Sequence, residues 1–189
     1  HDHAGVIGRH AGHLPLWSFL GQTPQTRPGP GMRKLTADME KRGEDRIDML
    51  HSLSRAILER VDYKTGTTHS RTIAEEAFAA GNGVCQDHAH IFIGIARSLG
   101  IPARYVSGYL MMDDRVEQDA THAWTEAYVE GLGWVGFDIS NGISPDQRYV
   151  RVATGRDYRD AAPVTGISFG TASQELEVEV AVEQRQVQQ

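Results

Sequence analysis

The sequence predicts an α+β protein in which a set of helices precedes an antiparallel sheet. Between residues 44 and 99, apolar side chains recur at the spacing of amphipathic and buried helices. From residue 103 the pattern changes to short runs rich in Tyr, Val and Trp, which glycine and polar residues separate. Helices followed by strands, rather than alternating with them, are typical of the α+β class.

Composition and charge describe an ordinary globular chain of 189 residues, long enough to form one domain with its own core. The formal net charge of -6 argues against nucleic acid and an anionic membrane surface as partners. The single cysteine excludes an internal disulfide, and a lone free thiol favours the cytoplasm. No apolar run approaches the roughly 18 residues that span a bilayer, so no membrane segment is expected.

The first part of the chain is interpreted as an N-terminal extension and linker, residues 1–32, ahead of a domain at 33–189. Four histidines open it and are expected to be solvated rather than to bind metal, namely His1, His3, His10 and His13. The apolar stretch 14–20 is expected to dock on the domain or on a partner. Residues 22–31 are expected to exclude helix because they contain Pro24, Pro28 and Pro30.

Three helical patterns follow before the cysteine. Residues 33–41 predict a short helix that ends near Gly43. The next helix has one apolar stripe, formed by Ile47, Leu50, Ser54, Ile57, Leu58 and Val61. A third helix is predicted over 73–80, with Thr72 as its cap and Glu75 completing a capping box.

Residues 84–99 predict the central helix, because apolar side chains occupy nearly every side of it and such a helix is buried. Gly100 and Pro102 end it. A polar loop is expected at 112–120, and irregular structure at 155–158. Strands are predicted at 103–111, 121–129, 134–139, 149–153 and 176–182, the last with an acidic solvated face.

The lone cysteine, Cys85, opens the central helix. The partial positive charge of a helix N-terminus favours a thiolate, which is the nucleophilic form. An inert structural cysteine is the commoner alternative, since free cysteine is usually buried. A nucleophilic thiolate also needs a base and a group that orients the base.

His122 and Asp138 can supply those two groups. If the strands that carry them form a hairpin centred on residue 130, His122 lies opposite Asp138 and the two side chains are neighbours. Asp138 would then accept a hydrogen bond from one ring nitrogen of His122, and the other nitrogen would face Cys85. The alternative is that His122 is a hydrogen-bonded core histidine and Asp138 a turn residue.

The oxyanion of an attacked carbonyl would need the N–H of Cys85 and a second donor. Candidates for the oxyanion and cleft positions are Asn82, Gln86, Tyr63 and Trp124, although packing is the simpler role for the tryptophan. We expect Asp87 to have a structural role, either accepting N–H groups at the helix start or pairing with Arg104. No metal site is expected, because Cys85 with His88 and His122 fits no zinc spacing.

Four segments resemble, in this order, the bacterial transglutaminase-like superfamily, whose members are often described as cysteine proteases. They are residues 83–90, 100–109, 122–126 and 133–138. The resemblance implies a papain-like fold, with a buried helix bearing the cysteine packed on an antiparallel sheet bearing His and Asp. It also implies a catalytic triad of Cys85, His122 and Asp138, and a cleft-shaping role for 155–158. Bacterial members often carry an N-terminal β-rich domain, for which residues 1–62 are too short and too helical.

These observations predict a cysteine enzyme that attacks amide or isopeptide bonds of a peptide or protein substrate and forms an acyl-enzyme on Cys85. Hydrolysis, as in a protease or amidase, is favoured, and no cofactor is expected. One alternative is a protein-glutamine transglutaminase, since water and an amine can resolve the same acyl-enzyme. The other is a non-catalytic binding module that keeps the fold.

Overall fold

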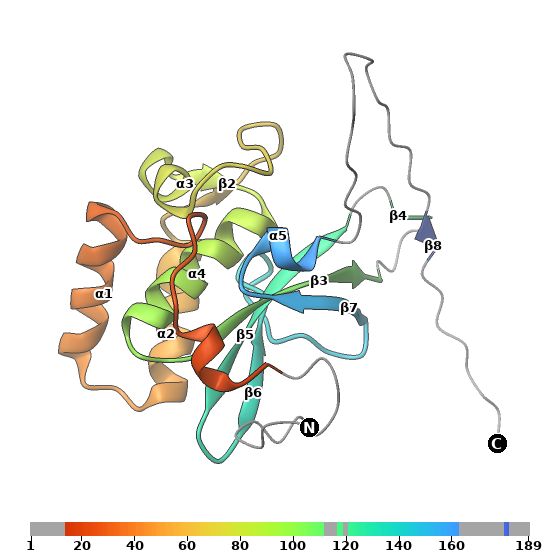
Figure 1. Cartoon of the computed structure of the whole chain (residues 1–189). Helices are drawn as coiled ribbons and strands as arrows, with labels where there is room; N and C mark the ends of the chain where they lie inside the picture. The colour runs from red at the N-terminus through yellow and green to blue at the C-terminus, as the bar shows by residue number, and fades with distance from the viewer. Residues whose placement is uncertain (1–13, 112–116, 119–120, 163–179, 182–189) are drawn as a thin grey trace.

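A computed structural model describes residues 14–111, 117–118, 121–162 and 180–181 (Figure 1). Its helices are η1 (Leu16–Phe19), α1 (Pro30–Arg42), α2 (Arg46–Leu58), α3 (Ala74–Ala80), α4 (Cys85–Ser98) and α5 (Tyr158–Ala161). Its strands are β1 (Asp62–Tyr63), β2 (Asn82–Gly83), β3 (Ala103–Leu110), β4 (Glu117–Gln118), β5 (His122–Val129), β6 (Gly133–Phe137), β7 (Tyr149–Gly155) and β8 (Val180–Ala181). The predicted α+β class is confirmed.

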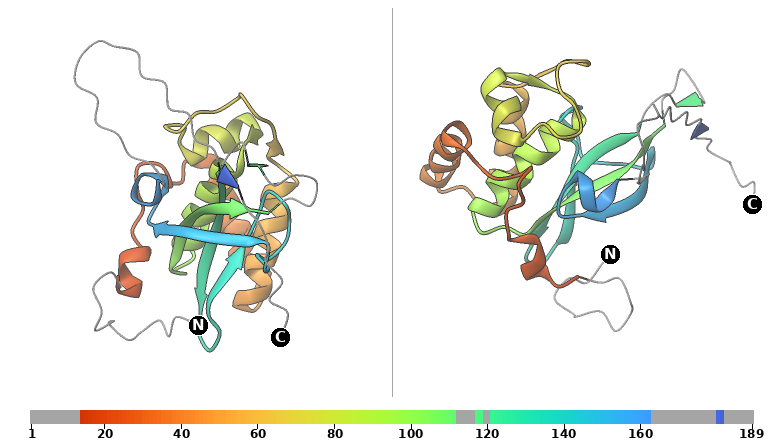
Figure 2. Two further views of the ribbon diagram at one scale, coloured as in Figure 1. Left: turned by 90° about the vertical axis from the view of Figure 1, so that its right-hand side faces the viewer. Right: turned by 45° about the horizontal axis from the view of Figure 1, so that its top comes forward.

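The main sheet has the strand order β6-β5-β3-β7, and every neighbouring pair in it is antiparallel. Helices α1 to α4 gather on one side of this sheet (Figure 1, and the right-hand view of Figure 2). Two short pairs lie outside it, the parallel pair β1–β2 and the antiparallel pair β4–β8. Strand β2 leads directly into α4.

Helix α4 is the centre of the core, as its all-round apolar pattern predicts. It contacts α1, α2 and α3 on one side and β3 and β5 on the other. Every residue from 87 to 97 is buried. A glycine is required at position 94, because a Cβ there would lie 2.1 Å from the carbonyl oxygen of Thr26.

Helix α1 begins earlier than predicted, at Pro30 rather than at residue 33, so the expectation of no helix up to residue 31 is wrong there. Proline suits the first helical turn because its missing N–H would have no partner in any case. The remaining N–H groups of that turn find a long-range acceptor. The carboxylate of Glu75 accepts from Gly29 N at 2.9 Å, Gly31 N at 2.6 Å and Met32 N at 3.1 Å.

Glu75 therefore caps α1 and not its own helix, and the predicted capping box at Thr72 is wrong. Thr72 accepts a hydrogen bond from His69 N at 3.0 Å and precedes the true N-cap, Ile73. The carboxylate of Glu76 takes the role expected of Glu75, accepting from Ile73 N at 3.3 Å.

We expect Glu75→Ala to lower the free energy of unfolding by about 2 kcal/mol, because three N–H groups lose a charged acceptor at the positive end of α1. Urea denaturation measures the change. Glu76→Ala is the matched control, since its single long hydrogen bond predicts a loss below about 1 kcal/mol. Equal losses in the two variants would contradict the assignment of Glu75 as the cap.

The segment ahead of α1 packs on the domain, which is one of the two outcomes expected for residues 14–20. Phe19 is buried and its ring meets Trp134 edge-on at 5.3 Å between centroids. Arg97 of α4 holds this segment on the domain through hydrogen bonds. Its guanidinium donates to the carbonyl oxygens of Phe19, Gly21, Ala103 and Arg156.

The C-terminal elements differ from prediction at their ends. Strand β6 stops at Phe137, before the predicted 139, and β7 runs on to Gly155. Within the expected polar loop, Glu117–Gln118 form β4, so the loop prediction is wrong at these two residues. Of the strand predicted at 176–182, only 180–181 lie among the described residues, and they form β8. The histidines at 1–13 lie outside the described residues. No helix in the described part of the chain has both the length and the apolar character needed to cross a membrane.

Candidate active site

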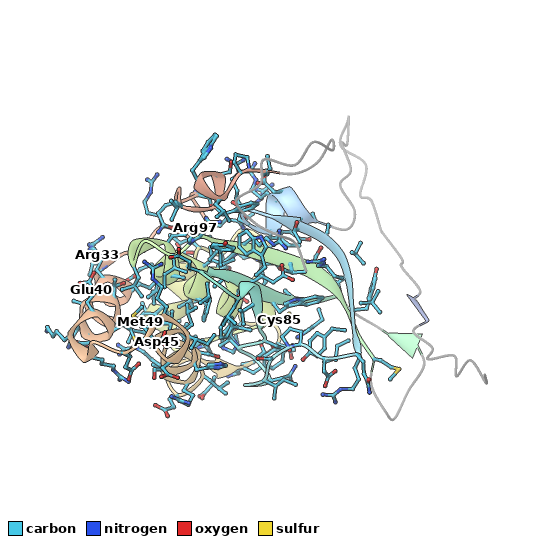
Figure 3. The ribbon with its side chains drawn as sticks, turned by 90° about the horizontal axis from the view of Figure 1, so that it is seen from below. Arg33, Glu40, Asp45, Met49, Cys85 and Arg97 are labelled. Atoms are coloured by element: carbon cyan, nitrogen blue, oxygen red, sulfur yellow. The ribbon has the colours of Figure 1, made fainter. Side chains whose placement is uncertain are left out.

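Cys85 is the first residue of α4 and is half-buried where the helices meet the sheet (Figure 3). The N–H of Val84, just before it, donates to Asp87 Oδ2 at 2.9 Å. The N–H groups of Asp87 and His88 both donate to the carbonyl oxygen of Val84. Within the described residues, the N–H groups of Cys85 and Gln86 have no acceptor, so the positive end of α4 is open at the thiol.

The structure brings Cys85, His122 and Asp138 together in one row. His122 Nε2 lies 2.6 Å from Asp138 Oδ2, and Cys85 is near enough for its hydrogen bonding and charge to help raise the pKa of the imidazole. Because Nε2 is engaged by the carboxylate, we infer that Nδ1 is the nitrogen that faces the sulfur. Asp138 is fully buried and the His122 side chain is 15% exposed, so solvent weakens their interaction little.

The row forms although the predicted strand register is wrong. Strands β5 and β6 pair Thr125 with Phe137, which centres the hairpin on residue 131 instead of 130 and places Asp138 opposite Trp124, not His122. The cause is the turn, because Val129 pairs with Gly133 and leaves a three-residue loop. An even shift keeps each side chain on its face of the sheet, so Asp138 still reaches His122 diagonally.

The charges in the row stabilise one another. Burial alone would lower the pKa of His122, but hydrogen bonds and charges of Asp138 and Cys85 raise it to about 9. Burial would raise the pKa of Asp138, yet hydrogen bonds from His122, Tyr149 and Asn141 hold it below its usual value. Asp138 is therefore a carboxylate and His122 an imidazolium at neutral pH, which is the partner that a thiolate needs.

We expect Asp138→Asn to lower the pKa of His122, because the variant loses the negative charge that offsets burial. The imidazolium, present up to about pH 9 in the natural protein, would then lose its proton at lower pH. NMR titration of the imidazole measures this directly. Asp146→Asn is the control, since Asp146 is exposed and pairs with Arg148 instead. An unchanged titration of His122 in Asp138→Asn would show that Asp138 does not raise the pKa of the imidazole.

Two residues at the site were missed by the sequence analysis. Asn141 Nδ2 and the hydroxyl of Tyr149 each donate to Asp138 Oδ2 at 2.7 Å. Asn141 could have been suspected, because an aspartate side chain often accepts hydrogen bonds from residues that closely follow it in a turn. Nothing in the sequence indicates Tyr149, because it is the pairing of β7 with β3 that places this residue at the site.

The four oxyanion and cleft candidates have different surroundings. Tyr63 is 53% exposed. Partial burial, and then the charges of Cys85 and Asp138, raise the pKa of its hydroxyl, so the hydroxyl stays protonated. The Asn82 amide donates to the carbonyl oxygen of Ala80 at 3.0 Å. Gln86 is half-buried and makes no side-chain hydrogen bond to another described residue. Trp124 is buried and its ring stacks beside His122 at 6.3 Å.

Asp87 has the structural role expected of it at the helix start. Besides Val84 N, its Oδ2 accepts from Thr68 Oγ1 at 2.6 Å, which fastens the 64–71 loop to the start of α4. The alternative pairing with Arg104 is wrong. Arg104 donates to Glu126 Oε2 at 2.7 Å, because the two residues face each other across β3 and β5.

The other histidines of α4 are bound to neighbouring residues. His88 Nε2 lies 2.9 Å from the carbonyl oxygen of Val61, and its Nδ1 lies 2.9 Å from Ser140 Oγ. His90 Nε2 accepts from Tyr158 N at 3.1 Å, and burial lowers the pKa of His90 to about 4. In the part of the chain that the structure describes, no three His, Cys, Asp or Glu side chains gather as a metal site.

A family model described as the transglutaminase-like superfamily matches residues 33–139. Two curated relatives are described as uncharacterized proteins. The one from Mycobacterium leprae is 38% identical over 65% of this chain and 45% of its own length. The one from Mycobacterium tuberculosis H37Rv is 37% identical over 72% of this chain and 46% of its own. This chain therefore spans about half the length of these relatives.

Two solved structures share the fold. A Cytophaga hutchinsonii protein called a "putative cysteine protease" has a TM-score of 0.67 and 32% identity, over 78% of this chain and 49% of that one. The periplasmic domain of TgpA from Pseudomonas aeruginosa, bound to ethylmercury, has a TM-score of 0.52 and 21% identity, over 68% of this chain and 49% of that one. The second likeness concerns the fold alone.

Proposed function

The chain belongs to the transglutaminase-like superfamily, and from this we propose that it is a cysteine acyl-transfer enzyme acting on amide or isopeptide bonds. Its substrate is a peptide or protein, and water is the usual acceptor. The observation that carries the proposal is the His122–Asp138 hydrogen bond of 2.6 Å beside Cys85 at the open end of α4. A thiolate, an acid–base group and an orienting carboxylate are the parts that this chemistry requires.

In the first half-reaction the Cys85 thiolate attacks the carbonyl carbon of the substrate. The carbonyl oxygen becomes an oxyanion, and the N–H groups at the start of α4 stabilise it. When the tetrahedral intermediate collapses, the C–N bond breaks and the His122 imidazolium gives its proton to the leaving amine. The product is a thioester on Cys85 with a neutral imidazole beside it.

In the second half-reaction His122 acts as a base. Its neutral imidazole takes a proton from the attacking water, which adds to the thioester carbonyl. The C–S bond then breaks, which releases a carboxylic acid and restores the thiolate beside the imidazolium. Asp138 holds the ring in one orientation through both steps, because its hydrogen bond to Nε2 is buried.

Tyr63 is our choice for the second oxyanion donor. Its hydroxyl stays protonated and lies within electrostatic reach of Cys85. The Asn82 amide is already engaged with the carbonyl oxygen of Ala80, which makes it the weaker candidate. Gln86 adds its backbone N–H, which is available at the first turn of α4.

Product analysis tests the proposal. The protein is incubated with peptide and isopeptide libraries, with and without a dansylated primary amine, and the products are identified by mass spectrometry. We expect new carboxylates in both cases and little amine adduct, with no product from Cys85→Ala. Predominant amine adducts would show a transglutaminase instead. No product from any library, with an ordinary slow thiol, would favour a non-catalytic binding module.

We also propose that the protein works in the cytoplasm, since a nucleophilic thiol persists best where thiols are kept reduced. The similar domain of TgpA is periplasmic, so the fold does not decide the compartment. Labelling of Cys85 in intact cells by a membrane-impermeant maleimide tests this. Labelling without permeabilisation would place the protein outside the cytoplasm.

A further inference from the structure

The carboxylate of Asp138 accepts more hydrogen bonds than orienting a histidine requires. Its Oδ2 alone accepts from His122 Nε2 at 2.6 Å, from the Tyr149 hydroxyl at 2.7 Å and from Asn141 Nδ2 at 2.7 Å. Its Oδ1 accepts from Asn141 N at 3.3 Å. Asp138 is fully buried, so these donors take the place of water around the charge.

Tyr149 also holds the imidazole by packing. Its ring centroid lies 6.0 Å from that of His122, at an interplanar angle of 56°. Trp124 backs both rings, lying 5.4 Å from Tyr149 edge-on and 6.3 Å from His122 in a stacked geometry. Tyr149 thus contacts the base through its ring and the carboxylate through its hydroxyl.

The backbone around Tyr149 is itself fixed. Tyr149 begins β7 and pairs with Leu110 of β3, and its N–H donates to the carbonyl oxygen of Asp146 at 3.1 Å. The position of the phenol beside Asp138 is therefore fixed by the strand pairing of the sheet. This rigidity is what a group that sets the position of a catalytic base requires.

We propose that Tyr149 is a positioning residue, which orients His122 through Asp138 and moderates the hold of Asp138 on the imidazolium proton. The proposal rests on the proposed function, in which His122 must both give and take that proton. A carboxylate that shares one oxygen among three donors holds its histidine less strongly than one bound to the histidine alone. The sharing keeps His122 able to release its proton to the leaving amine.

The surrounding charges agree with this role. Burial, followed by the hydrogen bond to Asp138, raises the pKa of Tyr149 far above its usual range, so the phenol remains a donor. The same bond helps to lower the pKa of Asp138. The titratable groups that face His122 are Cys85 from α4, Asp138 after β6 and Tyr149 from β7. Tyr63 of β1 and His88 of α4 lie within electrostatic reach of Asp138.

Tyr149→Phe tests the proposal because it removes the hydroxyl and keeps the ring packing. With more of the Asp138 charge directed at His122, the imidazole pKa measured by NMR is expected to rise by about half a unit or more. The alkaline limb of kcat is expected to move up in pH with it. We expect kcat to fall about tenfold and KM to change less than about twofold. Tyr109→Phe is the control, because it removes a tyrosine hydroxyl from the neighbouring strand β3, opposite Val150 of β7, and leaves the hydroxyl that binds Asp138 in place.

Two readouts separate this proposal from the proposed function. If His122 titrates in Tyr149→Phe as it does in the natural protein, the positioning role is overturned, even if kcat falls. If the titration shifts upward but the natural protein turns over no peptide or isopeptide, the electrostatic role of Tyr149 is supported and the proposed function fails. A matching shift in Tyr109→Phe would also overturn the assignment, because the effect would not be specific to the hydroxyl on Asp138.

Discussion

Cys85→Ser is expected to reduce turnover of any peptide or isopeptide substrate by at least about 10³-fold. The substitution keeps a hydroxyl of similar shape, but the imidazolium of His122 cannot stabilise an alkoxide at neutral pH as it stabilises a thiolate. The fold should persist, because serine is close in size to cysteine and residue 85 is only partly buried against the core. Initial rates with the substrates identified in the library experiment measure the loss.

His122→Ala is the companion variant, and combining it with Cys85→Ser should cost little more than either alone. Residues that act as one unit lose their function together, so their effects do not add. Thermal unfolding of each variant controls for folding. Residual turnover above about a tenth in folded Cys85→Ser would contradict a nucleophilic role for the thiol.

Arg97→Met is expected to lower the free energy of unfolding by about 3–5 kcal/mol. The Arg97 side chain is 4% exposed and donates to the carbonyl oxygens of four residues, namely Phe19, Gly21, Ala103 and Arg156. Burial lowers the pKa of Arg97 to about 10, so it is still a cation at neutral pH. A methionine fills similar volume but leaves these buried acceptors without a donor.

Arg97→Lys distinguishes hydrogen bonding from charge. Lysine keeps the cation but has one compact donor group, so it cannot bond the carbonyls of Phe19, Ala103 and Arg156 together as the planar guanidinium does. We expect it to recover less than about half of the lost stability. Urea denaturation measures both variants. A loss below about 1 kcal/mol in Arg97→Met would contradict the role assigned to this residue.

Local sequence patterns were sufficient to predict an element whose structure depends mainly on its own residues. Helix α4 was predictable because apolar residues surround it and Gly100 ends it with a φ of 73°. The strands of the main sheet were predictable from their β-branched and aromatic residues. Their lengths were not, because hydrogen bonds to neighbouring strands, and not composition, determine where each one ends.

Contacts between distant segments could not be predicted. The start of α1 at Pro30 depends on Glu75, which is far along the chain, and no local signal links the two. The hairpin register depended on the turn, where Gly131 and Gly133 both adopt positive φ and lengthen the loop. The position of Asp138 beside His122 survived this error because the side-chain period of a strand is two.

The three residues proposed to react could be recognised from the sequence, and the residues that support them could not. A cysteine at a helix start and a His and Asp on neighbouring strands are recognisable from residue type and spacing. Tyr149 and Asn141 hold Asp138 through the topology of β7 and a turn after β6, and such partners leave no motif. Trp124 was a cleft candidate for which packing was the simpler role, and the structure buries it with its ring beside that of His122.

The role proposed for His122 is to maintain Cys85 as a reactive thiolate, and the rate of alkylation by iodoacetamide between pH 5 and pH 10 measures how far it does so. The natural protein and His122→Ala are compared at each pH, with the site of labelling checked by mass spectrometry. We predict that below about pH 7 the natural protein reacts at least about tenfold faster than the variant. Identical rate profiles in the two proteins would show that His122 does not maintain the thiolate.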